Sequence, residues 1–131
     1  MTKKKYKWIE KELAIINEKP YKPTKKLEAR RKRHVKQYEQ QGWCDRDTWC
    51  LDQKFAQWIA PRLKRFIEVN NGFPHGMTEK TWNDTLNQML EGFEFMASDD
   101  YYSWDEKHKK YQEKATLAMK LFGEWGQHLW W

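Results

Sequence analysis

Large apolar side chains recur at intervals of three and four residues through most of this chain. The clearest run comprises Trp82, Leu86, Met89, Leu90, Phe93 and Met96. This spacing places such residues on one face of a helix, and no stretch shows the alternation that is typical of a strand. The sequence therefore predicts an all-α protein, a compact helical bundle of four to six helices with a basic N-terminal helical arm.

The boundaries of these helices follow from capping residues and prolines. The expected helices lie at about 5–17, 24–41, 49–69, 78–96 and 103–129. Thr24 and Thr78 are suitable N-caps, and Gly42 is a suitable stop after the second helix. Pro61 falls inside the third helix, where we expect a kink or two helices that meet at Ala60.

The composition supports a folded core and excludes several classes of protein. Charged residues make up 34% of the 131 residues, but nine tryptophans raise the aromatic share to 16%, which disordered chains lack. Two cysteines are too few for a disulfide scaffold. No apolar run is long enough to span a membrane or to resemble a signal peptide, so we expect a cytoplasmic protein. We expect two regions, a basic arm over residues 1–41 and an aromatic-rich core over 42–131.

The basic charge is concentrated at the N-terminal end. Residues 1–41 contain fourteen Lys and Arg and five Glu, a net charge of +9, whereas the remaining residues sum to −3. The cluster comprises Lys25, Lys26, Arg30, Arg31, Lys32, Arg33 and Lys36. Such a cluster indicates an anionic partner, either the phosphates of a nucleic acid or nucleotide or an acidic protein surface. The alternative is a solvated helix face, or an arm neutralised by the chain's own acidic residues.

Two charged residues interrupt the apolar face expected for residues 49–69. On a helical wheel, Arg62 and Asp52 fall among the apolar residues of this face, which include Leu51, Phe55 and Trp58. We therefore expect both charges to face inward, where each needs a partner. They are consistent with a partly buried ion-pair network, with Glu94 as a partner for Arg62. They are also consistent with a charged pocket in which Arg62, Lys64 and Arg65 bind an anion.

Few residues suggest catalysis or cofactor binding. The sequence has no glycine-rich phosphate loop, no nucleophile motif and no pair of histidines at helical zinc-site spacing. We therefore expect no metal, no cofactor and a non-enzymatic protein. The rival hypothesis is a small metal-dependent hydrolase that uses Asp52, His75 or the Asp99–Asp100 pair.

The C-terminal residues Trp130 and Trp131 are too apolar to be expected in water. We expect them to pack back onto the bundle, to form a homodimer interface or to bind a partner protein. If they bind a partner protein, we expect this protein to act as an inhibitor of that partner.

Three central segments resemble small uncharacterised proteins encoded by tailed bacteriophages. The segments are D-R-D-T-W-C-L-D from Asp45, P-R-L-K-R-F-I-E-V-N-N-G-F-P from Pro61 and M-T-E-K-T-W-N-D-T-L-N-Q-M-L-E-G-F-E from Met77. The resemblance covers about residues 43–95 and implies a viral protein in the cytoplasm of an infected bacterium, but no activity. By analogy with other small phage proteins, it suggests a host-takeover or counter-defence factor that acts by binding.

Overall fold

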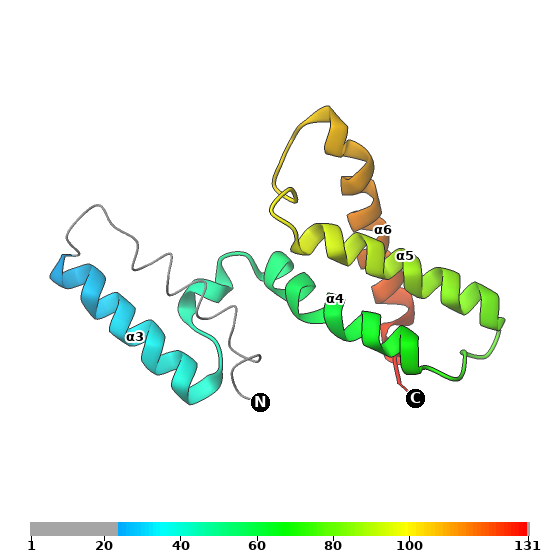
Figure 1. Ribbon diagram of the computed structural model, residues 1–131, viewed down its shortest axis with the longest axis horizontal. Coiled ribbons are helices and arrows are strands. Elements are labelled where there is room, and N and C mark those ends of the chain that lie inside the picture. The colour runs from blue at the N-terminus through cyan, green and yellow to red at the C-terminus, as the bar shows by residue number, and fades with distance from the viewer. Residues whose placement is uncertain (1–23, 131) are drawn as a thin grey trace. The chain divides into compact units, whose positions relative to one another are not determined.

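A computed structural model describes residues 24–130 of the chain, and in this range it is all-α with no strand. The four α-helices are α3 (Lys25–Gln41), α4 (Leu51–Val69), α5 (Glu79–Ala97) and α6 (Lys109–Trp125) (Figure 1). Three short 3-10 helices accompany them, η1 (Asp45–Thr48), η2 (Glu106–His108) and η3 (Gly126–His128). The helix expected at 5–17 and Trp131 lie outside the described residues. The chain divides into two compact units, residues 1–49 and 50–131.

The described part of the first unit consists of α3 and η1. Thr24 caps α3, because its Oγ1 accepts a hydrogen bond from the Leu27 backbone N–H at 3.2 Å. Gly42 ends the helix with a left-handed backbone (φ +83°) that residues with a side chain rarely adopt. Both boundaries agree with the sequence-based prediction. The buried side chains of α3 are His34 and Tyr38.

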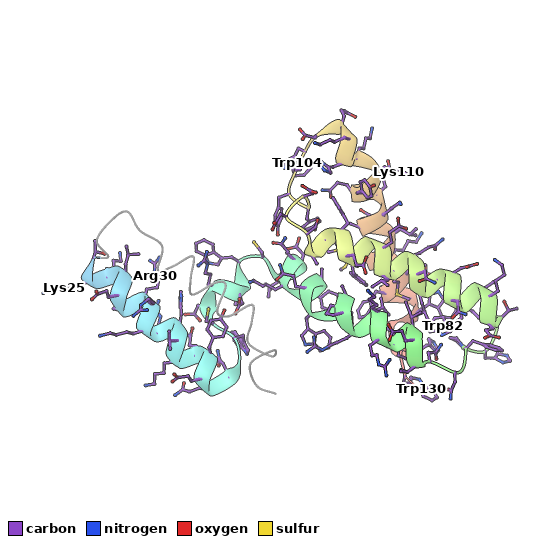
Figure 2. The ribbon with its side chains drawn as sticks, viewed as in Figure 1. Lys25, Arg30, Trp82, Trp104, Lys110 and Trp130 are labelled. Atoms are coloured by element: carbon purple, nitrogen blue, oxygen red, sulfur yellow. The ribbon has the colours of Figure 1, made fainter. Side chains whose placement is uncertain are left out.

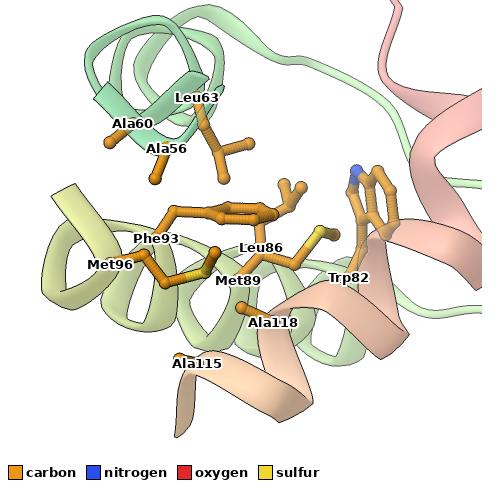
Figure 3. Close-up of a cluster of buried hydrophobic side chains, with 10 residues drawn as sticks. All are labelled: Ala56, Ala60, Leu63, Trp82, Leu86, Met89, Phe93, Met96, Ala115 and Ala118. Atoms are coloured by element: carbon orange, nitrogen blue, oxygen red, sulfur yellow. The ribbon is translucent and has the colours of Figure 1, made fainter. Parts of the chain in front are cut away.

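The second unit is built around α5, which contacts both α4 and α6. Trp82, Leu86, Met89, Phe93 and Met96 of α5 are at most 2% exposed. They pack with a buried cluster from the flanking helices that comprises Ala56, Ala60, Leu63, Ala115 and Ala118 (Figure 3). The apolar face expected for α5 is therefore the centre of the core.

The inward face of α4 differs from the predicted one. Its buried residues are Ala56, Ala60 and Leu63. Of the residues expected on the inward face, Phe55, Ile59 and Phe66 pack against the core, whereas Leu51 and Trp58 are 65% and 53% exposed. The α4 surface is apolar over a wide arc, and the two alanines occupy the part that faces the Phe93 ring (Figure 3). Small residues let helices approach closely, and the bulky Trp58 and Leu51 remain on the exposed side of this helix.

Of the two outcomes expected at Pro61, the meeting of two separate helices at Ala60 does not occur. Helix α4 runs without interruption from Leu51 to Val69 with Pro61 inside it. Pro61 is exposed, whereas Ala60 and Leu63 are buried. No helix among residues 24–130 is both long and apolar enough to cross a membrane.

Candidate nucleic-acid interface

Helix α3 carries its positive charge on one broad face. At 100° per residue, six basic residues cover an arc of about 160°, and no acidic residue of α3 falls within this arc. The six are Lys25, Lys26, Arg30, Lys32, Arg33 and Lys36, and all are exposed (Figure 2 labels Lys25 and Arg30). Glu28 and Glu39 lie together beside the arc. The buried residues His34 and Tyr38 face away from it, so the packing of α3 leaves the basic face open.

The basic residues of this face are largely not neutralised by the described part of the chain. Arg33 pairs with Asp45 across 3.7 Å, and both side chains are more than half exposed. Between residues 24 and 130, no carboxylate forms an ion pair with Lys25, Lys26, Arg30, Lys32 or Lys36. An exposed pair at this distance is weak, so Arg33 also remains available to an anion.

A shallow groove lies along α3, lined by Arg31, Lys32, Val35, Lys36 and Glu39. The groove is open to solvent rather than enclosed. A site for a small molecule ordinarily buries most of its ligand. The groove therefore lacks the enclosure expected of a small-molecule site.

The short helix η1 is fastened to α3 by side-chain hydrogen bonds. The amide Nε2 of Gln37 donates to Asp45 Oδ1 at 3.0 Å, and the Asp45 backbone N–H donates to Gln37 Oε1 at 2.9 Å. The buried Cys44 donates its backbone N–H to Asp47 Oδ2 at 2.9 Å. This arrangement could not be predicted from the sequence, because no recognisable motif marks a glutamine and an aspartate eight residues apart.

Burial beneath η1 alters the titration of two α3 side chains. Burial lowers the pKa of His34, and the neighbouring Arg33 cation lowers it further. Burial also raises the pKa of the Tyr38 phenol, as do its hydrogen bonds with Cys44 and Asp47. His34 is therefore favoured in its neutral form, and the charge of α3 at neutral pH comes from its lysines and arginines.

The pocket expected around Arg62, Lys64 and Arg65 is not formed. All three side chains are exposed, so the inward position expected for Arg62 is wrong. Arg62 Nη1 donates to the Trp58 carbonyl oxygen at 2.8 Å, and its guanidinium lies 4.5 Å from the centre of the Trp58 ring. Arg65 pairs with Glu68 at 2.8 Å. These residues lie on the outer side of α4 because Ala56 and Ala60 occupy the inner one.

Asp52 is exposed as well, but it has defined partners. Tyr101 and Tyr102 donate their hydroxyl protons to its two carboxylate oxygens at 2.7 and 3.1 Å. The Tyr101 hydrogen bond lowers the pKa of Asp52, while burial and this bond raise the pKa of Tyr101 to about 12. Among residues 24–130, Asp52 forms neither the ion-pair network nor the pocket predicted for it. The carboxylate instead fastens the connection between α5 and α6 to the start of α4.

The residues proposed for a metal-dependent hydrolase are not assembled into a site. In the range 24–130, no three His, Cys, Asp or Glu side chains converge as metal ligands would. His75, Asp99 and Asp100 are exposed, and the Asp52 oxygens accept from two tyrosines. The arrangement of these residues gives the hydrolase hypothesis no support.

Trp130 does not pack back onto the bundle, since its side chain is 75% exposed (Figure 2). Trp104, in the connection before η2, is 92% exposed.

Comparison of the chain with protein-family models, curated proteins and solved structures finds no match.

Proposed function

We propose that this protein is a non-enzymatic binding protein whose helix α3 binds the phosphate backbone of nucleic acid. The observation that carries the proposal is the continuous basic face of α3, on which five lysine or arginine side chains have no carboxylate partner in the described range. The phosphates of a nucleic acid neutralise such a face, and the counterions that were bound to these phosphates are released, which favours binding.

The dimensions of the face suit a polymeric anion. From Lys25 to Lys36 it extends about 17 Å, at 1.5 Å per residue. Contacts of this kind fix position along a phosphate backbone but do not read base sequence. We therefore expect binding with little dependence on base sequence. In an infected cell, a protein of this kind would act on host or viral nucleic acid by occupying it.

The dependence of affinity on salt tests this proposal. Binding of a fluorescent oligonucleotide is measured by anisotropy from 20 to 200 mM salt. A protein that contacts four to six phosphates gives a slope of log K against log salt of roughly −3 to −5. Replacement of Lys25, Lys32 and Lys36 by Gln removes about two units of this slope.

A matched control exists on α6 and η2. Lys107, Lys109 and Lys110 are exposed and lie in the second unit, so their replacement by Gln changes the net charge equally. This control variant is expected to bind almost as the parent protein does. Absence of binding at 20 mM salt, or equal losses in the two triple variants, contradicts the proposal.

A second candidate function is inhibition of another protein through exposed aromatic side chains. The exposure of Trp130 is the observation that favours it, because tryptophans are frequent among the residues that dominate binding at interfaces. Under this hypothesis, alanine at Trp130 and Trp131 abolishes capture of a purified partner, and charge reversal at Arg30 to Arg33 does not. The opposite pattern supports the nucleic-acid proposal.

A further inference from the structure

Two exposed tryptophans belong to the same unit as the basic face. Trp43 is 47% exposed and Trp49 is 82% exposed, and they stand on either side of η1. Both rings leave much of their apolar surface in water, where it is available to stack against a ligand. Both tryptophans therefore belong to the unit that also carries the basic face of α3.

The backbone that carries these tryptophans is held against α3. Gln41 Nε2 donates to the Trp43 carbonyl oxygen at 3.1 Å, directly after the end of α3. The reciprocal hydrogen bonds between Gln37 and Asp45 hold Asp45 against α3. The Trp49 backbone N–H in turn donates to the Arg46 carbonyl oxygen at 3.3 Å. The two rings are therefore presented from a short, hydrogen-bonded segment.

Cationic side chains with adjoining exposed aromatic rings are the combination that binds single strands. In a single strand, unpaired bases can stack on aromatic side chains while lysine and arginine follow the phosphates. In a duplex the bases are already stacked inside the helix, so a tryptophan gains no comparable contact. Exposed rings in the same unit as a phosphate-binding face would thus distinguish the two forms of nucleic acid.

We propose that the ligand is single-stranded nucleic acid, and that Trp43 and Trp49 stack against its bases while the basic face of α3 binds its phosphates. The inference rests on the proposed function, since stacking alone would not retain a strand. It adds the class of nucleic acid and two residues that charge analysis does not identify.

The test compares a labelled twelve-nucleotide single strand with the duplex of the same sequence, with the full chain at low salt. The expected result is at least tenfold tighter binding of the single strand. Trp43→Ala combined with Trp49→Ala lowers single-strand affinity at least tenfold, because each stacked base contributes roughly a five- to hundredfold factor. The same double variant leaves duplex affinity and the salt slope almost unchanged.

The control is Trp104→Ala combined with Trp130→Ala, which removes two exposed rings from the second unit. It is expected to retain single-strand binding. Trp49→Ala alone provides a variant at a largely exposed position, with a smaller loss of single-strand affinity and an unchanged circular dichroism spectrum. It keeps the test decisive if the double variant fails to fold.

The outcomes separate this inference from the proposed function. If neither probe binds at low salt, the proposed function fails. If both probes bind equally and Trp43 and Trp49 are dispensable, phosphate binding by α3 stands and only the stacking inference is overturned. Equal losses in the double variant and in the Trp104 and Trp130 control also overturn it.

Discussion

Gly92 on α5 faces Ala118 on α6 where the two helices approach most closely. A Cβ atom at position 92 would overlap with the Ala118 Cβ and with the Lys114 carbonyl oxygen. The carbonyl belongs to the α6 backbone and cannot move aside as a flexible side chain does. Close contact between α5 and α6 therefore requires glycine at this position.

We predict that Gly92→Ala lowers the free energy of unfolding by about 1–3 kcal/mol, since it forces the packed helices apart. The control is Gly123→Ala on α6, where a Cβ meets nothing within 4 Å. There, alanine is expected to stabilise the helix by roughly 0.5–1 kcal/mol. Urea unfolding followed by circular dichroism measures both, and equal effects would contradict the close approach.

Phe93→Ala is expected to destabilise the second unit by about 3–5 kcal/mol. The Phe93 ring is fully buried and makes edge contacts with Phe55 and Phe122, with ring centres 5.6 and 5.9 Å apart. Trp104→Ala removes a larger ring that is 92% exposed and should change stability by less than about 0.5 kcal/mol. The same urea experiment compares the two, and a similar cost for both would place the core elsewhere.

The hydrogen bonds from Tyr101 and Tyr102 to the Asp52 carboxylate predict a loss of stability in acid. The Tyr101 hydrogen bond lowers the pKa of Asp52 in the folded state. The ionised Asp52 carboxylate therefore stabilises the folded protein fully above the pKa of an unfolded aspartate, about 4. The effect disappears as the pH falls through the lowered folded pKa. The stability difference between the parent protein and Asp52→Asn should therefore narrow below about pH 4. Tyr101→Phe removes the same donor and should reduce the acid dependence similarly.

The buried imidazole of His34 predicts a second acid effect, confined to the first unit. Its pKa is lowered by burial and by Arg33, so the neutral form stabilises the folded state above about pH 6.5 and this stabilisation is lost as the pH falls through the lowered value. An NMR titration of the His34 ring should give a midpoint below 6.5. Asp45 acts in the opposite direction, so the midpoint should fall further in Asp45→Asn. A midpoint at or above 6.5 in the parent protein would contradict the burial.

The ends of α3 and the inner face of α5 could be predicted from the sequence because their signals are local. Thr24 and Gly42 bound α3 as expected, and Trp82 to Met96 of α5 face the core. The rotation of α4 could not be predicted in the same way. Its surface is apolar on several sides, and only the fit of Ala56 and Ala60 against the Phe93 ring selects the buried one.

The positive charge of the candidate interface could be predicted from the sequence, whereas the contacts around it could not. A run of lysines and arginines is visible in the sequence, whereas the placement of Asp45 beside Arg33 and Gln37 depends on how the chain turns after Gly42. The inward position predicted for Arg62 failed for the same reason as the α4 face. A helical wheel places residues relative to one another but does not say which side meets a neighbouring helix.

The central position of α5 has a consequence for how residues 50–131 fold. Helix α5 buries side chains against both α4 and α6, and its Gly92 against α6, so a hairpin of α4 and α5 alone would leave the α6 side of α5 in water. Neither pair of helices is a self-sufficient fragment. The three helices should gain and lose their structure together, in one cooperative transition.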